Sequence, residues 1–282
     1  MIIIDGKKAA ATLREELKKK ISELKSTYNT VPGLTVILVG EDPPSKIYVR
    51  NKEKFANEVG IKSEVVRYPD TIEEKTVLNK IEELNKNSNV SGILVQLPLP
   101  KHIDKRKIIG AILPDKDVDG LHPMNVGNLS SGYDSMVPCT PLGCYLLIKD
   151  VEKDLNGKHA VVIGRSNLNG KPMTQLLLKE NCTVTITHSK TKDLKVECKR
   201  ADIIVAAVGR PKLVKADWVK KDAIVIDVGI NKTDTGLVGD VDFEEVSKVA
   251  KAITPVPGGV GPMTIACLLN NTVECFKKVR SN

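Results

Sequence analysis

Aromatic residues are scarce in this chain. Tryptophan occurs once, tyrosine five times and phenylalanine three times among 282 residues, which is 3% of the sequence. The hydrophobic core must therefore consist mostly of Val, Ile, Leu and Ala, although hydrophobic residues reach 41%. The sequence also lacks an arginine-rich arm and a face that interleaves basic with aromatic residues, so we exclude nucleic acid as a partner.

No single sign of charge dominates the chain. Its 43 lysines and arginines are interspersed with 35 aspartates and glutamates, which leaves a net charge of +8. We interpret this surplus as a mildly basic surface that suits anionic ligands such as phosphates and polyglutamates. A non-catalytic basic binding protein is the alternative interpretation, and the mixing of the charges argues against it.

Signals for metal binding, export and membrane insertion are also missing. The six cysteines form no CxxC pair, and no group of His and Cys has the spacing of zinc ligands. We therefore expect reduced thiols, no bound metal and a cytoplasmic location. No stretch approaches the roughly 18 apolar residues of a membrane span, and the apolar run in MIIIDGKKAAATL is too short for a signal peptide.

What the chain does have is an alternation of helix and strand patterns. Short apolar runs such as LTVILV at 34–39 are typical of strands buried on both faces of a parallel sheet. The expected strands are 34–39, 64–68, 92–97, 159–163, 183–187, 202–208, 223–228 and 252–254. The expected helices are 6–28, 45–60, 71–87, 103–112, 141–152, 170–180, 192–199 and 262–280. The pattern predicts an α/β protein with two domains and a hinge around 121–141.

A glycine turn in the second half is typical of a nucleotide site. The segment HAVVIGRSNLNGKPMTQLLL reads as strand, turn and helix, with Gly164 ending the strand and Gly170 opening the helix. Such a turn directs backbone N–H groups and the helix dipole at a pyrophosphate. The spacing departs from GxGxxG, because Ser166 takes the place of the middle glycine, so an ordinary α/β turn remains an alternative.

The strand after this turn indicates which dinucleotide is bound. An NAD site usually has Asp or Glu at the end of this strand to hold the ribose 2′-OH. Here His188, Ser189 and Lys190 occupy that place, and Arg165 lies in the turn. These donors and positive charges favour the 2′-phosphate of NADP, although Arg165 and Lys190 could also be solvated surface charges.

Two later strands end in small residues. Gly209 in AAVGRP and Gly229 in DVGIN would let a flat nicotinamide ring approach the backbone. Both positions also suit ordinary turn glycines, so this observation supports the nucleotide site without establishing it.

The first half contains a lysine on a face that should be apolar. At about 100° per residue, Tyr48, Lys52, Phe55 and Val59 form one stripe of the helix 45–60, so Lys52 should point inward. A lysine that is removed from water loses its proton more readily and can then act as an acid or base near neutral pH. The alternative is a lysine that is ion-paired or extends its ammonium to solvent.

Polar residues at the carboxyl ends of the first strands suggest a substrate site near this lysine. Gln96 follows a strand and precedes two prolines, and its amide can pair with the edge of a heterocycle. Asp119 in DKDVDG can accept two N–H bonds from an amino-pyrimidine edge. A capped strand end and a turn-forming aspartate are the respective alternatives.

The segment TPVPGGVGPMTIA at 254–266 is the most unusual loop. It holds three prolines and three glycines and leads directly into a helix with Pro262 in its first turn. Ordering such a loop is entropically costly, so a ligand or a special chain path is expected to justify it, with a purely structural turn as the alternative.

Together these blocks resemble the bifunctional methylenetetrahydrofolate dehydrogenase/methenyltetrahydrofolate cyclohydrolase family. The resemblance covers nearly the whole chain. The matching blocks, in order, are YVRNK (48–52), VQLPLP (95–100), DKDVDG (115–120), PCTP (138–141), GRSNLNGKP (164–172), DVGIN (227–231) and PVPGGVGPMT (255–264).

The resemblance implies two consecutive reactions. NADP oxidises 5,10-methylenetetrahydrofolate to the 5,10-methenyl cation, and water then opens that cation to 10-formyltetrahydrofolate. Lys52 would be the key group for hydrolysis, with Tyr48 stacking on the folate and tuning Lys52. Gln96 would hold both Lys52 and the substrate, and Asp119 would anchor the pterin.

The resemblance also implies the binding residues and the assembly. The implied substrate-binding residues are Tyr48, Lys52, Gln96, Leu97, Pro98, Asp119, Pro257, Gly258 and Gly259. The cofactor-binding residues that we predict are Gly164, Arg165, Ser166, Ser189, Gly209, Gly229 and Ile230. Members of the family form homodimers through the nucleotide domain, and they act on tetrahydrofolate derivatives that can be polyglutamylated.

The expected architecture follows from these assignments. A catalytic domain spans 1–138 and is completed by the C-terminal helix 262–282, which should return to it and bring the two ends of the chain together. A Rossmann-like NADP-binding domain spans 139–261.

Some alternatives stay open at this point. Lys190 stands where an arginine is common in the family, and Asn169 replaces an apolar residue, which leaves the strictness of NADP over NAD open. A dehydrogenase-only folate enzyme would lack the hydrolytic step, and retention of Tyr48 with Lys52 argues against it. Another two-domain α/β NADP dehydrogenase would not explain the QLPLP and PGGVGPMT blocks.

Overall fold

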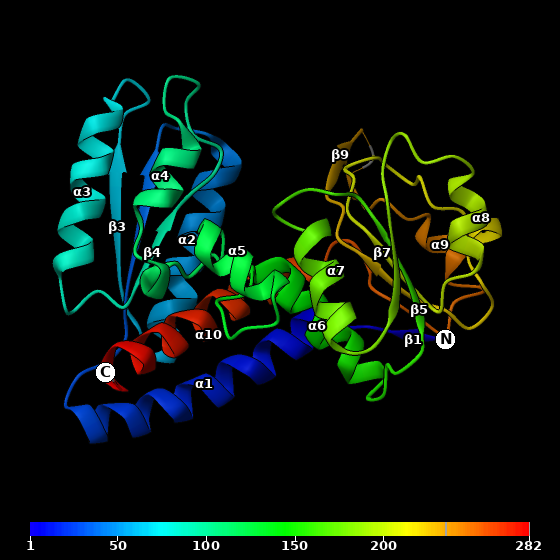
Figure 1. Ribbon diagram of the computed structural model, residues 1–282, viewed down its shortest axis with the longest axis horizontal. Coiled ribbons are helices and arrows are strands. Elements are labelled where there is room, and N and C mark those ends of the chain that lie inside the picture. Colours follow the sequence, from blue (N-terminus) through cyan, green and yellow to red (C-terminus); the bar gives the residue numbers. More distant parts are fainter. Residues whose placement is uncertain (235, 282) are drawn as a thin grey trace. The chain divides into compact units, whose positions relative to one another are not determined.

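The computed structural model describes residues 1–234 and 236–281 and divides into two compact units (Figure 1). The six-stranded unit consists of Met1–Ala10, Leu129–Gly132 and Thr140–Thr264. The three-stranded unit consists of Ala11–Asn128, Tyr133–Cys139 and Ile265–Asn282. The six-stranded sheet and the three-stranded sheet are both parallel, as the apolar runs predicted.

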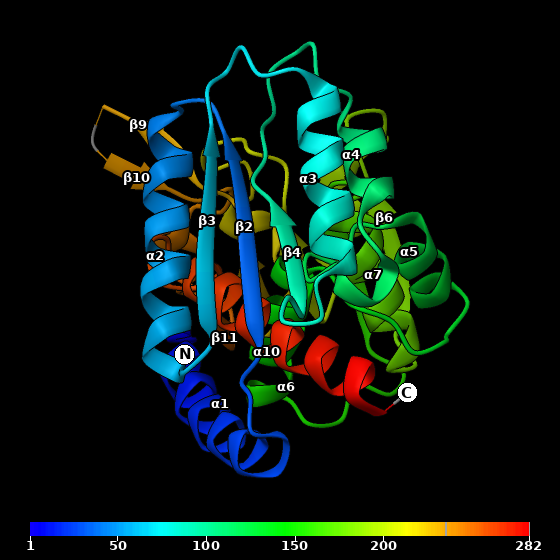
Figure 2. The same cartoon turned by 90° about the vertical axis from the view of Figure 1, so that its left-hand side faces the viewer.

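The three-stranded sheet has the order β3-β2-β4 (Figure 2). Its strands are β2 (Gly33–Val39), β3 (Lys62–Tyr68) and β4 (Gly92–Val95). Every residue of the central strand β2 is buried, which confirms the expectation for LTVILV. Because β3 and β4 flank β2 on opposite sides, the chain changes direction across the sheet at the carboxyl end of β2, where open α/β sheets bind ligands.

Helices pack on this sheet through branched aliphatic side chains. The helices of this unit with their bounds are α2 (Pro43–Val59), α3 (Glu74–Lys86), α4 (Lys105–Ala111) and α5 (Pro123–Ser130). One face carries a core in which Ile37 and Ile93 of the sheet meet Val77 and Ile81 of α3 and Ile108 of α4. A short 3₁₀ turn, η1 (Pro114–Lys116), follows α4.

The start and end of α2 are fixed by local chemistry. The carboxylate of Asp42 accepts hydrogen bonds from the backbone N and the hydroxyl of Ser45, and prolines occupy the first helical positions. Gly60 ends the helix in the left-handed conformation at φ +93°, and its N–H returns to the last turn. These caps define the register in which α2 presents Lys52.

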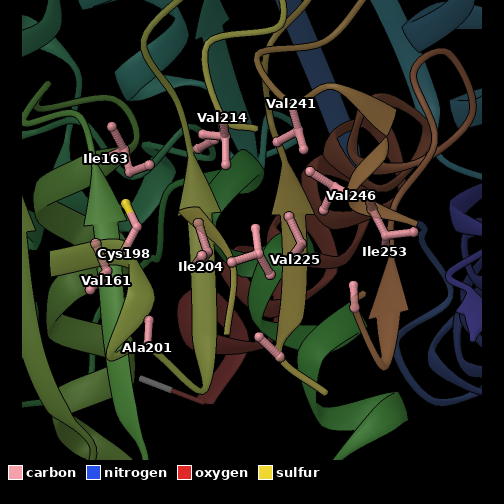
Figure 3. Close-up of a cluster of buried hydrophobic side chains, with 14 residues drawn as sticks. Val161, Ile163, Cys198, Ala201, Ile204, Val214, Val225, Val241, Val246 and Ile253 are labelled. Atoms are coloured by element: carbon pink, nitrogen blue, oxygen red, sulfur yellow. The ribbon is translucent and has the colours of Figure 1, made fainter. Parts of the chain in front are cut away.

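The six-stranded sheet has the order β1-β11-β8-β7-β5-β6. Its strands are β1 (Ile2–Ile3), β5 (His159–Ile163), β6 (Thr183–Thr187), β7 (Ile203–Ala206), β8 (Ile224–Asp227) and β11 (Ala252–Ile253). Figure 3 shows Ile163, Ile204, Val225 and Ile253 side by side on neighbouring strands, where they form one buried cluster with Cys198 and others. With β6 and β7 on opposite sides of β5, the carboxyl end of β5 is the switch point of this sheet.

The helices that lie within the six-stranded unit have 13 residues or fewer. They are α6 (Cys139–Val151), α7 (Gly170–Lys179), α8 (Leu194–Lys199) and α9 (Phe243–Val246), with the 3₁₀ turn η2 (Ala216–Trp218). Two long helices, α1 (Gly6–Tyr28) and α10 (Val260–Ser281), each have residues in both units.

The structure departs from the sequence-based expectations at several places. The segment 121–141, expected as a hinge, does contain points at which the chain passes between the units, but it also contains α5, which was not expected. A short antiparallel pair, β9 (Asn231–Thr233) and β10 (Gly236–Val238), was not expected. Residues 1–10 belong to the six-stranded unit, because β1 pairs with β11, whereas the end of α10 belongs to the three-stranded unit. The two ends of the chain therefore lie in different units.

All six cysteines are buried and outside any disulfide. Among the described residues, no helix has both the length and the apolar character needed to cross a membrane. A search of residues 1–234 and 236–281 finds no group of three or more His, Cys, Asp or Glu side chains that could hold a metal ion.

Candidate active site

The buried face of α2 includes Lys52. Its members are Ser45, Val49, Lys52, Ala56 and Val59. Lys52 is only 8% exposed, which confirms that it points inward. Val59 is buried as predicted, but Tyr48 is 38% exposed and Phe55 is only half-buried, beneath the guanidinium of Arg14, so the predicted stripe was wrong for Tyr48. Tyr48 lies one turn before Lys52 on the rim of this face.

The amine of Lys52 meets the end of β4. Its Nζ donates a hydrogen bond of 2.9 Å to Oε1 of Gln96. The amide of Gln96 is oriented by a second bond, because its Nε2 donates to the carbonyl of Leu97 at 2.7 Å. The backbone N–H of Gln96 donates to Ile37, so the residue is held at the carboxyl end of the sheet, where the sequence placed it.

Asp119 lies along the same end of β4. Asp117 forms a parallel β-bridge with Ile93 of β4, so the chain runs beside this strand. Asp119, two residues later, therefore lies near the carboxyl end of β4. Burial raises the pKa of the half-buried Asp119 carboxyl, while the charge of Lys52 lowers it and that of Asp117 raises it. The influence of Lys52 on Asp119 indicates that these two groups share one electrostatic environment.

The segment that carries Asp119 is held from several directions. Nδ2 of Asn271, on α10, donates to the carbonyls of Val118 and Val137 at 2.9 Å each. The thiol of Cys139 donates to the carbonyl of Val118 at 3.3 Å and lies 3.8 Å from Oδ1 of Asp119. Burial, with a smaller contribution from Asp119, raises the pKa of this thiol well above its ordinary value, which keeps it a neutral donor.

The buried Asp117 stabilises the turn on the other side. Its Oδ2 accepts hydrogen bonds from the backbone N of His122 at 2.7 Å and from Nδ2 of Asn125 at 2.9 Å. Gly120 is required here, because it has φ +68° and a Cβ would lie 2.6–2.8 Å from the backbone of residues 136–138. The three-stranded unit thus brings Lys52, Gln96 and Asp119 together on a rigid frame.

In the six-stranded unit, the turn after β5 has the geometry of a phosphate-binding loop. Gly164 has φ +120°, and a Cβ there would lie 2.4 Å from the carbonyl oxygen of Ala207. A Cβ on Gly170 would lie 1.9 Å from the carbonyl oxygen of Gly164, so only glycine permits this close turn. Oγ of Ser166 accepts a bond from the N–H of Asn169 at 3.1 Å, and Arg165 is exposed. The residues present therefore fit a dinucleotide, whose phosphates would face the first turn of α7.

The end of β6 carries no acidic residue, as the sequence indicated. The turn that follows is closed by bonds from the N–H of His188 to Oγ1 of Thr191 and from the N–H of Lys190 to Nδ1 of His188. Ser189 and Lys190 are exposed. These side chains follow β6, next to the carboxyl end of β5. They can reach a ligand there, where the ribose of a dinucleotide would lie.

Two further loops follow β7 and β8 at the same end of the sheet. They contain Gly209, at φ +66°, and the pair Gly229 and Ile230, of which Ile230 is half exposed. Gly229 is required for a reason the sequence did not reveal, because a Cβ would lie 2.2 Å from the carboxylate of Asp240. A shallow depression nearby is lined by Pro141, Asn169, Gly170, Met173 and Val228, among others.

The glycine-proline loop is packed against the start of α1. The N–H of Lys7 donates to the carbonyl of Gly258 at 3.1 Å. A Cβ on Gly6 would lie 1.7 Å from the carbonyl oxygen of Gly259. Pro257 to Gly259 belong to the six-stranded unit, so their expected place in the substrate pocket stays a prediction.

Comparison with known proteins agrees with both units. Residues 4–119 match the catalytic domain of the tetrahydrofolate dehydrogenase/cyclohydrolase family, and residues 138–280 match its NAD(P)-binding domain. The chain is 78% identical over 278 residues to a protein from Pelagibacter ubique named Bifunctional protein FolD, with 99% of each chain covered.

Solved structures give the same result. The fold matches the bifunctional methylenetetrahydrofolate dehydrogenase/cyclohydrolase from Campylobacter jejuni with a TM-score of 0.96 and 51% identity over 99% of each chain. It matches the enzyme from Trypanosoma brucei, solved with NADP cofactor and an inhibitor, with a TM-score of 0.95 and 38% identity over 100% of this chain and 99% of that one. The chain therefore belongs to the tetrahydrofolate dehydrogenase/cyclohydrolase family.

Proposed function

We propose that this protein oxidises 5,10-methylenetetrahydrofolate with NADP and hydrolyses the resulting 5,10-methenyltetrahydrofolate to 10-formyltetrahydrofolate. The match of both units to the family and the identity to its members over nearly the whole chain support this function. The observation that carries the hydrolytic half is the bond between the buried Nζ of Lys52 and Oε1 of Gln96, next to Asp119.

Hydrolysis of the methenyl cation requires a group that handles protons. Water adds to the bridging carbon and loses a proton, the bond from this carbon to N5 breaks, and N5 gains a proton. Nζ of Lys52 is the group that moves a proton at this site, and Gln96 holds it in place. The carboxylate of Asp119 anchors the substrate by accepting N–H bonds from the pterin edge, and Tyr48 stacks on the folate.

Hydride transfer relies on placement. When bound, NADP accepts the hydride from the bridging carbon of the substrate. Gly164 and Ser166 present the close turn to the pyrophosphate, while Arg165 and Ser189 bind the 2′-phosphate from two adjacent strand ends. Gly209, Gly229 and Ile230 border the nicotinamide end.

The remaining assignments extend this proposal. Leu97 and Pro98, which follow Gln96, line the folate site, and Pro257, Gly258 and Gly259 stay predicted substrate-binding residues. We also propose a homodimer that forms through the nucleotide-binding unit, substrates that include polyglutamylated tetrahydrofolates, and a cytoplasmic location.

The hydrolytic role of Lys52 is tested by Lys52→Met. This substitution keeps most of the side-chain volume and removes the amine. We expect hydrolysis of 5,10-methenyltetrahydrofolate to slow by about 100-fold or more, because general acid–base groups contribute on that order. The measurement is the loss of methenyl absorbance with no nicotinamide cofactor present.

Lys54→Met is the matched control, because Lys54 is exposed on the same helix. It should leave hydrolysis unchanged. A Lys52→Met protein that hydrolyses at the normal rate would remove Lys52 from the mechanism. Wild-type protein that reduces NADP with methylenetetrahydrofolate but shows no hydrolysis would favour the dehydrogenase-only alternative. Wild-type protein that converts neither folate substrate would favour the alternative of another NADP dehydrogenase.

A further inference from the structure

Two buried carboxylates lie behind the loops that follow β7 and β8. They belong to Asp227, the last residue of β8, and Asp240, which follows the β9–β10 pair. The proposed function uses neither of them. Because a buried carboxylate is unfavourable unless it is well hydrogen-bonded, their partners indicate what they do.

Asp240 holds the loop after β7. Its carboxylate is fully buried, and Oδ2 accepts hydrogen bonds from the backbone N–H of Val208 at 2.7 Å and of Gly209 at 2.9 Å. Oδ1 accepts from the N–H of Arg210 at 2.8 Å and from Nδ2 of Asn231 at 2.9 Å. Three consecutive peptide groups of one loop are thus turned toward a single side chain.

Asp227 completes the arrangement from the other side. Its Oδ1 accepts bonds from the N–H of Gly229 at 3.0 Å and of Asp240 at 2.9 Å, and its Oδ2 accepts from Val241 at 2.9 Å. Burial, with a further contribution from Asp240, raises the pKa of Asp227 to about 7, although these backbone donors oppose the shift. Asp227 therefore fixes the chain at Asp240, and Asp240 fixes the loop after β7.

The two carboxylates pack directly against two glycines, Gly229 and Gly239. A Cβ on Gly229 would lie 2.2 Å from Oδ1 of Asp240, and a Cβ on Gly239 would lie 1.8 Å from Oδ2 of Asp227. The two carboxylates therefore occupy the space that side chains at these glycines would fill. The positions of the loops at 208–210 and 229–230 depend on the aspartates.

These loops are the ones assigned to the nicotinamide end of the cofactor. Because peptide groups are planar and trans, turning the N–H groups of residues 208–210 toward Asp240 turns the preceding carbonyl groups the opposite way. The loop therefore presents its backbone acceptors away from the carboxylate. A carboxamide, with two N–H donors, is a ligand group that such acceptors suit.

We propose that Asp240 is a positioning residue for the dehydrogenase reaction, which holds the loop at Val208–Arg210 through its N–H groups, and the segment after Gly229–Ile230 through Asn231, in the shape that receives the nicotinamide end of NADP. This inference rests on the proposed function for the cofactor, and it adds a residue that does not itself touch the cofactor. The hydrolytic reaction, which depends on Lys52, does not need Asp240.

The test is Asp240→Asn in the full-length protein. The amide keeps the shape of the side chain, but its NH₂ group faces backbone N–H donors that need an acceptor. We expect the Kd for NADP, measured by titration calorimetry, and the KM for NADP to rise about tenfold or more, as the loss of one charge-assisted hydrogen bond implies. Hydrolysis of methenyltetrahydrofolate without cofactor should stay within twofold of wild type.

Asp242→Asn is the matched control. Asp242 lies two residues away and loses the same charge, but its carboxylate pairs with Lys215 at 2.9 Å instead of backbone groups. It should leave both the Kd for NADP and hydrolysis unchanged. A merely structural role of Asp240 would instead lower the melting temperature and both activities together, and that result would overturn the proposal.

A second variant covers the case in which Asp240→Asn does not fold. Asn231→Ala removes one of the four donors to Asp240 and leaves the three backbone bonds in place. We expect a rise of about threefold in the Kd for NADP with unchanged hydrolysis, which corresponds to a hydrogen bond at the weak end of the usual range. An unchanged Kd in either folded variant overturns this inference alone, whereas wild-type protein that fails to bind NADP overturns the cofactor proposal as well.

Discussion

Lys52 and Lys116 show how two buried lysines of one unit differ. Nζ of Lys116 donates to three carbonyls, those of Leu84, Asn85 and Asn87 at 2.7–2.9 Å, and so caps the end of α3. An ammonium has three hydrogens, and Lys116 has a carbonyl acceptor for each of them, so its role is structural. Within the described residues, the structure gives Nζ of Lys52 a single hydrogen-bond partner, Gln96. Two hydrogens of Lys52 are therefore available to a water or a substrate.

Arg165 should decide between the two nicotinamide dinucleotides. Because its guanidinium is exposed in the turn after β5, Arg165→Ala should cost little stability. We expect the Kd for NADP to rise about tenfold or more and the Kd for NAD to stay nearly constant, since only NADP carries the 2′-phosphate. Calorimetric titration with each dinucleotide measures both values.

Arg200→Ala serves as the control for this experiment. Arg200 is an exposed arginine of the same unit whose guanidinium lies 3.9 Å from Glu197. Its removal should affect neither dinucleotide. An equal loss of NADP and NAD affinity in Arg165→Ala would contradict the contact with the 2′-phosphate.

At the scale of elements, a lysine and a tyrosine of α6 connect that helix with the end of α7. Nζ of Lys149 and the hydroxyl of Tyr145 donate to the two carboxylate oxygens of Glu180 at 2.6 and 2.7 Å. The bond from Lys149, followed by that from Tyr145, holds the pKa of Glu180 below its ordinary value. The folded state therefore favours the ionised carboxylate.

This arrangement makes the stability of the fold pH-dependent. A carboxyl whose pKa is lowered by folding contributes stability above its unfolded pKa, near 4.5, and loses that contribution as the pH falls through its folded pKa. Glu180→Gln should therefore lower the free energy of unfolding by about 1 kcal/mol at pH 7, because the pair is partly exposed. Chemical denaturation from pH 7 to pH 3 should show this difference shrink below about pH 4.5.

Glu244→Gln provides the matched charge change, because Glu244 is exposed in the same unit. This variant should leave the pH dependence unchanged. A difference between Glu180→Gln and wild type that persists undiminished at pH 3 would show that the carboxylate charge is not what connects α6 with α7.

The same scale shows which elements the sequence can predict. Strands 159–163 and 183–187 have the expected ends, because their apolar or β-branched runs are bounded by turn residues. β1 was missed, since a strand of two residues with exposed side chains carries no periodic signal. The helix α5 was missed because its sequence, PMNVGNLS, is typical of loops. Asn125 stabilises it through bonds to Pro114 and Asp117, which are tertiary contacts.

The site was predictable to a similar degree. Lys52, Gln96 and Asp119, which the structure brings together, could be singled out because their residue types stand out in apolar or proline-rich surroundings. Tyr48 was wrongly placed in the buried stripe of α2, where Val49 is buried instead, because periodicity alone does not resolve neighbouring positions. Asn271 and Asp240 were missed, since their partners are backbone groups that are remote in the sequence. The glycine before Asp240, in the run GDVD, is the signal that could have indicated the close contact.

At the scale of the whole molecule, the chain path interleaves the two units. The first ten residues belong to the six-stranded unit, and α1 continues from there into the three-stranded unit. The last helix, α10, passes in the same way from Thr264 to Ile265. No single cut of the chain therefore separates a complete nucleotide-binding unit from a complete catalytic unit.

Hydrogen exchange can show to which unit the N-terminus belongs. The N–H groups of Ile2 and Ile4 donate to Lys251 and Ile253, so they should open with the six-stranded unit. NADP at 100 times its Kd stabilises the unit that binds it by about 2.7 kcal/mol. We expect the amides of Ile2, Ile4 and β8 to exchange about 100-fold more slowly with NADP, while those of β2 keep their rates. Unchanged exchange at Ile2 and Ile4 would contradict this assignment, and equal slowing in β2 would show that the two units open together.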